Sequence, residues 1–593
     1  MSEALKKFAL KGREPRNGQR IVIDAIEKAF KTKDTVVLEA PVGSGKSAIA
    51  MTIAEWLGNS HILTPRKSLQ DQYYNDFPEI TCVMKGKSGY PCVPRMKRMP
   101  AAKSAVSNGV TTYFPSLPQV DETSKDYIAL SDSLKRRIPV FFKPEVGCDE
   151  GPCANDTRVK KNCTMNDERP CPYNVAMNVA QISPHVVHNV HSFFYQNKYG
   201  EGFAERELLV VDEAHDLEGI VRGFLQTRIM VMNQNLDKAG PLPQRSDPVQ
   251  VWAEWFLKSA DLSFDKLQRL YPDIEFDEQI KAYYSEKGRW VREEVTPSGS
   301  SKVVSTPEKK FAESISKILD IYGEMESSEY VVSTVDNQDK QRKEFTFTPL
   351  SLKGRPESMF LSYGKKRLLM SGTIYDRSNF CRNLGLNPAS VEFIVINSEF
   401  PVRNRPIFAY SDLMTNNSHK AWEDTDAFPK MIANIKKILS VYKDKKGLIH
   451  APSYSAAQAI SAALQDDRII THSSSDFLDK LDYFCGKTDG NEVLISPTCQ
   501  QGVDFKGGIA RFQLVLRVPY LNTTDDFIDH MRETNFPWYN YQSLIIFGQQ
   551  IGRVVRSVDD WGHTYLLDSR FLPYLKRNRS TLQNWLNQAI QYR

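Results

Sequence analysis

The chain has 593 residues, of which 41% are hydrophobic and 25% charged, a composition typical of a globular protein with three or four domains. It contains no apolar run of about twenty residues, and its charged N-terminus lacks the apolar core of a secretory signal. We therefore expect a cytoplasmic protein without a membrane partner. The net charge of +5 is too small to indicate or exclude a nucleic-acid partner.

The N-terminal part predicts strands that alternate with helices. Short apolar runs at Thr35–Glu39 and Ser60–Thr64 have the composition of buried strands. The segments that follow them, Ser47–Leu57 and Ser68–Phe77, are predicted to be helical. Strands separated by helices predict a parallel sheet that is covered on both faces.

Two segments interrupt this alternation. Residues 85–172 are rich in Cys, Pro, Lys and Arg and have poor periodicity, which predicts an insertion without a large apolar core. A strong strand candidate, Glu207–Val211, follows this insertion. Residues 223–345 have mainly helical patterning and form a second insertion. From Lys366 the alternation returns and continues to the C-terminus, which predicts a second α/β lobe.

A phosphate-binding loop lies between the first strand and the first of these helices. The sequence Ala-Pro-Val-Gly-Ser-Gly-Lys-Ser ends at Lys46 and Ser47. Lys46 is expected to reach the β- and γ-phosphates of a nucleotide, and Ser47 is expected to ligate Mg²⁺. The usual pattern has Gly where this chain has Ala40, but it retains the turn glycines Gly43 and Gly45.

An acidic motif, Asp-Glu-Ala-His, follows the strand candidate Glu207–Val211. Asp212 at the end of a strand is expected to hold Mg²⁺, and Glu213 is expected to orient the attacking water. ATP hydrolysis also needs positive charge at the transition state, which a second lobe can supply. Residues 549–556 predict a helix that carries Arg553 and Arg556 on one face.

These motifs, in this order, resemble the superfamily 2 helicases, and specifically the XPD/DinG family, whose members hold an iron–sulfur cluster. Arg16 and Gln19 match the family's nucleotide-sensing Gln motif. Motif Ia is matched by Thr64-Pro65 with Gln70 and Gln72, and motif III by Ser371-Gly372-Thr373. Residues 447–454 match the motif IV strand and turn, Gly502 and Asp504 match motif V, and motif VI is matched by Gln549, Gly552, Arg553 and Arg556. Gln501 departs from the Glu that commonly precedes the motif V glycine, so the role of this position stays open.

The resemblance implies an α/β fold with two RecA-like parallel-sheet lobes, a cysteine-rich iron–sulfur insertion and a mainly helical Arch-like insertion. The expected division places helicase domain 1 in residues 1–84, 173–222 and 346–380, the cluster insertion in 85–172, the Arch-like insertion in 223–345 and helicase domain 2 in 381–593.

The resemblance also implies the ligands and the activity. ATP is expected to bind Arg16, Gln19, Gly43, Ser44, Gly45, Lys46, Ser47, Gly502 and Asp504, with Lys46, Asp212, Glu213, Gln549, Arg553 and Arg556 acting in its hydrolysis. The implied activity is a monomeric DNA helicase that moves 5′ to 3′ on single-stranded DNA and opens tailed or forked duplexes, with a role in DNA repair. The implied location is the nucleoid in a bacterial or viral setting and the nucleus in a eukaryote.

Six of the nine cysteines lie between positions 82 and 171. Clustered thiols in a reducing compartment more often hold metal than form disulfides, and from spacing alone zinc and iron–sulfur are equally compatible. The resemblance favours a [4Fe-4S] cluster held by Cys92, Cys153, Cys163 and Cys171, with Cys148 as the alternate to Cys153. Cys82 is expected to be a buried strand residue instead.

Two other functions remain compatible with the motifs. The first is an ATPase or translocase that is stimulated by nucleic acid and remodels complexes without unwinding. The second is a DNA-binding scaffold with a degenerate motor, which the presence of Lys46, Asp212, Glu213 and Arg553 disfavours.

Overall fold

The computed structural model describes residues 2–9, 12, 14–90, 172–200, 202–260, 262, 307–323, 325–337, 341–416, 426–486, 489–499, 505 and 507–592. In this part of the chain the first predicted elements are present at nearly the predicted bounds. They are the strands β1 (Thr35–Glu39) and β2 (Ser60–Thr64) and the helices α2 (Lys46–Leu57) and α3 (Lys67–Asp76). Both strands are buried along their whole length, as expected for parallel strands covered on both faces.

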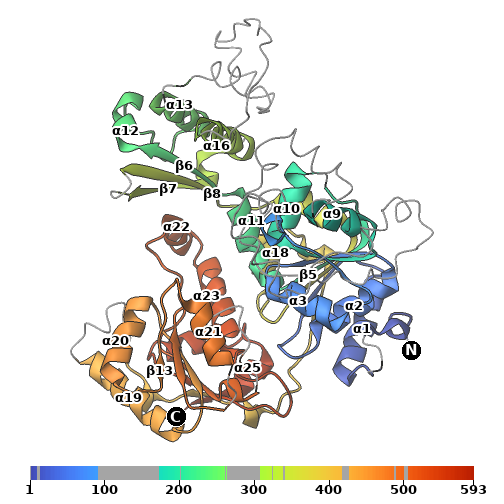
Figure 1. The fold of residues 1–593 in the computed structure, drawn as a ribbon, viewed down its shortest axis with the longest axis vertical. Helices are drawn as coiled ribbons and strands as arrows, with labels where there is room; N and C mark the ends of the chain where they lie inside the picture. The colour runs from blue at the N-terminus through green and yellow to red at the C-terminus, as the bar shows by residue number, and fades with distance from the viewer. Residues whose placement is uncertain are drawn as a thin grey trace, which may run out of the picture.

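The first lobe is built on a seven-stranded parallel sheet with the order β10-β1-β9-β5-β2-β4-β3. Its further strands are β3 (Cys82–Met84), β4 (His185–Asn189), β5 (Arg206–Asp212), β9 (Gly364–Ser371) and β10 (Val391–Val395). Helices cover both faces of this sheet (Figure 1): α1 (Asn17–Ala29), α9 (Pro172–Ile182), α10 (Val190–Tyr199), α11 (Leu217–Leu225), α17 (Arg355–Met359) and α18 (Arg377–Asn383).

The division between the lobes differs from the expected one. The expected boundary placed residues 381–593 in the second lobe. Strand β10 nevertheless pairs with β1 in parallel register, from Thr35 opposite Val391 to Glu39 opposite Val395. The first sheet therefore takes its edge strand from beyond the expected boundary, and the chain crosses to the second lobe after β10.

The second lobe contains another seven-stranded parallel sheet, with the order β13-β14-β12-β15-β16-β11-β17. Its strands are β11 (Ile407–Ala409), β12 (Gly447–His450), β13 (Ile469–Ile470), β14 (Val493–Ser496), β15 (Phe512–Val515), β16 (His563–Leu566) and β17 (Ile590–Tyr592). Its helices are α19 (Ala427–Val441), α20 (Tyr454–Leu464), α21 (Phe477–Cys485), α22 (Asp526–Thr534), α23 (Phe536–Ile551), α24 (Phe571–Asn578) and α25 (Asn584–Ala589). The two parallel sheets confirm the predicted pair of RecA-like lobes.

The second insertion forms a separate layer beside the first lobe (Figure 1). Helices α12 (Asn233–Ala239), α13 (Val249–Ser259) and α16 (Pro307–Tyr322) accompany an antiparallel sheet with the order β6-β8-β7. These strands are β6 (Thr227–Met232), β7 (Tyr330–Asn337) and β8 (Arg342–Pro349). The sheet was not predicted, although β6 alternates strictly between buried and exposed residues, as a strand with one buried face does. Among the described residues, no helix is both long and apolar enough to cross a membrane.

Candidate active site

The phosphate-binding loop joins β1 to α2 in the first lobe. Gly43 and Gly45 have φ angles of 78° and 82°, the left-handed region that glycine adopts without steric cost. Ala40 continues the sheet, because its backbone N–H donates to the Ser371 carbonyl at 2.9 Å. Ala40 has no positive φ, so this position does not need glycine, and the departure from the usual pattern leaves the loop intact.

The two residues predicted to sense the nucleotide lie against this loop. Arg16 donates through Nη2 to the Gly43 carbonyl at 2.8 Å, and its backbone N–H donates to Gln19 Oε1 at 3.0 Å. A Cβ atom on Gly45 would lie 2.2 Å from Gln19 Nε2, so the amide of Gln19 is packed directly on the turn. Ser44 and Gln19 line a smaller hollow beside the main cleft.

The acidic motif faces the loop from the end of β5. Tyr73 of α3 donates its hydroxyl proton to Asp212 Oδ2 at 3.1 Å, and the Glu213 backbone N–H donates to Asp212 Oδ1 at 3.0 Å. Burial and then the neighbouring Glu213 raise the pKa of Asp212 to about 6. Burial also raises the pKa of Glu213, but the charges of Lys46 and His215 outweigh it and keep Glu213 ionised more readily than usual.

The donor set at this position fits Mg²⁺. Ser47 and Asp212, the two residues predicted to hold the ion, line the same cleft as Lys46 and Glu213. Burial and the neighbouring carboxylate of Glu213 disfavour the ionised form of Asp212. A divalent cation would stabilise that ionised form. Hard oxygen ligands of this kind are the ones that Mg²⁺ prefers.

His215 connects the acidic motif to the Ser-Gly-Thr motif after β9. Its Nδ1 lies 2.8 Å from Ser371 Oγ, and Ser371 Oγ also accepts from the Thr373 backbone N–H at 3.0 Å. Burial lowers the pKa of His215, but the carboxylates of Asp216 and Glu213 outweigh burial and raise this pKa above its ordinary value. The two motifs are therefore one hydrogen-bonded unit.

The second lobe contributes the C-terminal end of α23. Gln549 donates through Nε2 to Thr373 Oγ1 at 2.9 Å, which joins the two lobes at the cleft. The prediction of a helix over residues 549–556 is wrong, because α23 ends at Ile551 and Gly552 caps it. Arg553 turns back so that its Nε donates to the Gln549 carbonyl at 3.0 Å. Arg553 and Arg556 therefore do not share a helical face, although both line the cleft.

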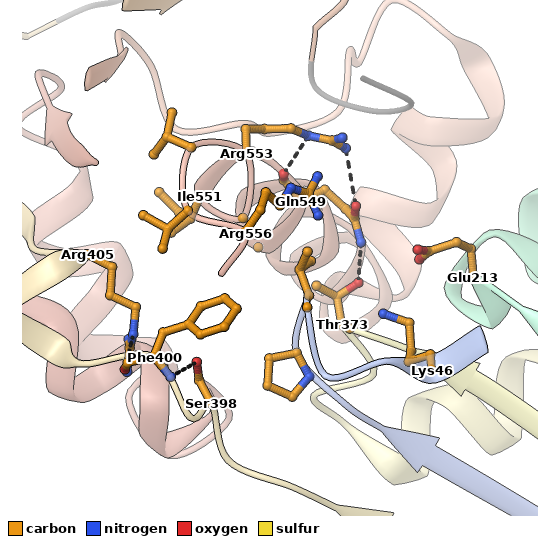
Figure 2. Close-up of a pocket in the computed structure, with 18 of the residues that line it drawn as sticks. Lys46, Glu213, Thr373, Ser398, Phe400, Arg405, Gln549, Ile551, Arg553 and Arg556 are labelled. Carbon is orange, nitrogen blue, oxygen red and sulfur yellow. Dashed lines mark hydrogen bonds between the residues drawn. The ribbon is translucent and has the colours of Figure 1, made fainter. Parts of the chain in front are cut away.

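A cleft of about 640 Å³ lies between the lobes (Figure 2). It brings together nearly all the predicted nucleotide residues that the structure describes: Gly43, Gly45, Lys46, Ser47, Asp212, Glu213, Gln549, Arg553 and Arg556. Its far wall contains residues that no motif indicated, namely Ser398, Phe400, Arg405 and Trp585. Arg405 donates through Nε to the Phe400 carbonyl at 3.1 Å and stacks on the Trp585 ring at 5.3 Å.

The predicted motif Ia is only partly exposed. Gln70 is fully buried and donates through Nε2 to the Met84 carbonyl at 3.1 Å and the Val187 carbonyl at 3.3 Å. It supports the sheet and is not available to a nucleic acid. On α10, which follows β4, Phe193 and Phe194 are core residues, and Tyr195 is 57% exposed.

Several predicted site residues lie outside the described residues. These are Gly502 and Asp504 of motif V and the five cysteines Cys92, Cys148, Cys153, Cys163 and Cys171. Cys82 is confirmed as a buried residue of β3, where burial raises its pKa to about 11. In the part of the chain that the structure describes, no group of three or more His, Cys, Asp or Glu side chains could hold a metal ion.

Parts of the chain match known protein families and known helicases. Residues 435–589 match the helicase C-terminal domain family, and residues 13–112 match the type III restriction enzyme res subunit family. The ATP-dependent DNA helicase YoaA of Haemophilus influenzae is 26% identical over 236 residues, which cover 36% of this chain and 35% of that protein. The Fanconi anemia group J protein homolog of Gallus gallus is 26% identical over 176 residues, 26% of this chain and 14% of that protein.

The fold has counterparts among solved structures. An XPD helicase superposes with a TM-score of 0.54 at 17% identity, covering 98% of this chain and 99% of that one. An Xpd protein of S. tokodaii gives a TM-score of 0.50 at 14% identity, covering 98% and 100%. The chain therefore has the fold of the XPD helicase, and over part of its length its sequence is similar to helicases of the XPD/DinG type. The chain spans only about a third of the length of YoaA in this match.

Proposed function

We propose that the protein is an ATP-dependent DNA helicase that couples ATP hydrolysis to duplex unwinding. One observation carries the proposal: a single cleft holds Lys46, Asp212 and Glu213 of the first lobe opposite Gln549, Arg553 and Arg556 of the second. A site divided in this way can respond to nucleotide with a change in the separation of the lobes, which is the movement that a motor needs.

Each side chain has a role that its position supports. The loop N–H groups, the N-terminus of α2 and Lys46 would bind the phosphates, and Glu213 would orient the attacking water. Arg553 would approach the γ-phosphate from the second lobe and stabilise the charge that develops there, with Gln549 fixing its direction. Mg²⁺, when bound by Ser47 and Asp212, would neutralise phosphate charge.

Replacement of the loop lysine tests the nucleotide site. Lys46→Ala is expected to abolish ATP hydrolysis, because no other cation of the loop reaches the phosphates, and to leave the melting temperature unchanged. The measurement is phosphate release with and without single-stranded DNA. Normal turnover in this variant would place hydrolysis at another site.

The track and its direction are part of the proposal. We propose that the protein, as a monomer, moves 5′ to 3′ on single-stranded DNA and opens tailed or forked duplexes, and that it serves DNA repair. The support is kinship with the XPD/DinG family. A strand-displacement assay should show separation of a duplex with a 5′ single-stranded tail and not of one with a 3′ tail. ATP hydrolysis without displacement of either duplex would instead indicate a translocase.

A [4Fe-4S] cluster is proposed for the first insertion. Cys92, Cys153, Cys163 and Cys171 would hold it, with Cys148 as the alternate to Cys153. The thiols outside the insertion support this choice indirectly, because burial raises the pKa of Cys82, Cys381 and Cys499 to about 11 and disfavours the thiolate that a metal needs. Protein purified without oxygen should be brown and contain iron and sulfide. A colourless protein that contains zinc would contradict the cluster.

A further inference from the structure

Glu218 is a buried carboxylate that no motif of the sequence indicated. It lies on α11, directly after the acidic motif, and is 6% exposed. Two donors belong to its own lobe: Arg222 Nη2 at 2.8 Å and Asn383 Nδ2 of α18 at 2.8 Å. Two more come from α23 of the second lobe: Trp538 Nε1 at 2.5 Å and Gln542 Nε2 at 2.7 Å. The carboxylate thus joins the two lobes through four hydrogen bonds.

Arg222 extends this junction to the second insertion. Besides pairing with Glu218, it donates to the Pro349 and Leu350 carbonyls, where β8 leaves the insertion. Its guanidinium lies 4.7 Å from the centre of the Phe527 ring of α22. Both charged side chains are at most 10% exposed, so their hydrogen bonds are shielded from competing water.

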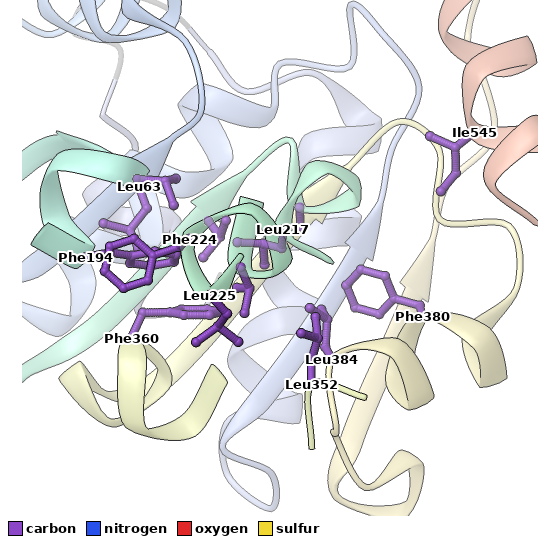
Figure 3. Close-up of a cluster of buried hydrophobic side chains, with 14 of the residues drawn as sticks. Leu63, Phe194, Leu217, Phe224, Leu225, Leu352, Phe360, Phe380, Leu384 and Ile545 are labelled. Atoms are coloured by element: carbon purple, nitrogen blue, oxygen red, sulfur yellow. The ribbon is translucent and has the colours of Figure 1, made fainter. Parts of the chain in front are cut away.

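The side chains of α23 that meet the first lobe form one stripe. Trp538, Gln542, Ile545 and Gln549 are spaced at intervals of four, three and four residues, which places them on the same face of a helix. Ile545 belongs to the same apolar cluster as Phe380 of α18 (Figure 3). Gln549, at the end of the stripe, bonds Thr373 at the cleft. About 10 Å of helix separates Gln542 from Gln549.

The stripe leaves little freedom for α23 to shift. A Cβ atom on Gly548 would lie 1.8 Å from Tyr375 Oη, so the helix backbone is in direct contact with the turn after β9. An axial or rotational shift at Trp538 and Gln542 would therefore be transmitted along a rigid helix to Gln549 and Arg553. The hydrogen bonds that Glu218 accepts from the second lobe fix the part of α23 that carries Trp538 and Gln542. Through the rigid helix they determine the position of its other end.

We propose that Glu218 is a positioning residue that holds α23, and through it Gln549 and Arg553, in register with the nucleotide. This inference rests on the proposed ATP hydrolysis. Glu218 itself touches no nucleotide, because it does not line the cleft. Its effect should fall on the chemical step, where Arg553 acts, and not on nucleotide binding by the loop of the first lobe.

Two substitutions remove the interlobe hydrogen bonds. Trp538→Phe retains an aromatic ring, smaller than the indole, and removes the N–H donor. Gln542→Met keeps the length of the side chain and removes the amide. Two controls match them. Tyr541→Phe, on the same helix, removes a buried hydroxyl that has no hydrogen-bond partner among the described residues. Asn383→Ala removes a donor to the same carboxylate from within the first lobe.

The readouts are steady-state ATP hydrolysis with single-stranded DNA, binding of fluorescent ADP with Mg²⁺, and the melting temperature. Trp538→Phe with Gln542→Met is expected to lower kcat at least about tenfold while KM for ATP and ADP affinity stay within about twofold of wild type. Both controls should retain at least about half of the wild-type kcat.

Three results would overturn the inference. The first is a double variant with wild-type kcat. The second is an equal loss of kcat in the controls. The third is a loss of kcat accompanied by an equal loss of ADP affinity or by unfolding, which would indicate a purely structural role. If the wild-type protein does not hydrolyse ATP, the proposed function fails together with this inference. If the wild-type protein hydrolyses ATP and one of the three results is found, only this inference fails.

Discussion

At the scale of single residues, the sequence indicated several side chains that line the cleft and missed the residues that hold these side chains in place. Lys46, Asp212 and Glu213 were found because a strand, a glycine turn and a helix place them by local geometry. Tyr73 was missed because a tyrosine on a helix indicates only a core position, and its bond to Asp212 joins residues 139 positions apart. Long-range hydrogen bonds of this kind leave no periodic signal in the sequence.

Tyr73 provides a direct test of how Asp212 is held. Tyr73→Phe keeps the buried ring and removes the hydroxyl that donates to Asp212 Oδ2. A hydrogen bond to a charged group contributes roughly 1.5–3 kcal/mol, so we expect the affinity for ADP with Mg²⁺ to fall about tenfold or more. The affinity for ADP without Mg²⁺ should not change, since Asp212 acts through the ion. Equal losses with and without Mg²⁺ would show that the hydroxyl supports the fold and not the carboxylate.

Two buried histidines of the first sheet predict a pH dependence of stability. His61 Nδ1 lies 3.1 Å from His188 Nε2, and burial, followed by the nearby Arg206, lowers the pKa of His61 to about 3. Burial likewise lowers the pKa of His188, with His61 and Arg206 adding to the effect. The unfolded chain therefore binds protons below a pH of about 6.5 that the folded protein does not bind.

Acidification should consequently favour the unfolded state. The free energy of unfolding is expected to fall by about 1 kcal/mol per histidine between pH 7 and pH 5.5. Urea denaturation at several pH values measures this fall, and His188→Gln should reduce it by about 1 kcal/mol over this range. His530→Gln, at a partly buried position of α22, is the matched control for the loss of any histidine. An identical slope in His188→Gln would contradict the assignment.

At the scale of elements, three strands of the first lobe, β1, β2 and β5, were predicted nearly to the residue, and the end of α23 was not. Periodicity extends the helix to Arg556, whereas Gly552 ends it and frees Arg553 to bond back to the Gln549 carbonyl. The antiparallel sheet of the second insertion was also missed. Its pairing of β6 with β8 joins residues more than a hundred positions apart, so only the alternation in β6 could have indicated it.

Helix α23 should tolerate no side chain at Gly548. A Cβ atom there would lie 1.8 Å from Tyr375 Oη and 2.8 Å from Thr373 Cγ2, so Gly548→Ala requires α23 and these two side chains to move apart. We expect loss of ATP hydrolysis by about tenfold or more, because Gln549 and Arg553 move with the helix. Gly219→Ala on α11 is the control, since its Cβ meets nothing within 4 Å among the described residues and alanine favours a helix. Similar activity in both variants would contradict the close contact.

At the scale of the whole molecule, two lobes of the same architecture follow from the sequence because each repeats the strand–helix alternation. Their relative placement does not follow from it. The chain leaves the first lobe only after β10, and a shared apolar cluster with Phe380 and Ile545 connects the two. The cleft between the lobes is a property of this placement, since Lys46 and Arg553 belong to different lobes.

A nucleotide that binds both walls should therefore stabilise the whole molecule. A non-hydrolysable ATP analogue is expected to raise the melting temperature more than ADP does, because its γ-phosphate adds the contact with Arg553. At a concentration of 100 times Kd, a ligand stabilises by about 2.7 kcal/mol, and a tenfold gain in affinity adds about 1.4 kcal/mol at fixed concentration. Arg553→Ala should abolish the difference between the two nucleotides and retain the effect of ADP, whereas Lys46→Ala should weaken both. If the analogue and ADP stabilise the wild-type protein equally, then the second lobe does not contact the γ-phosphate.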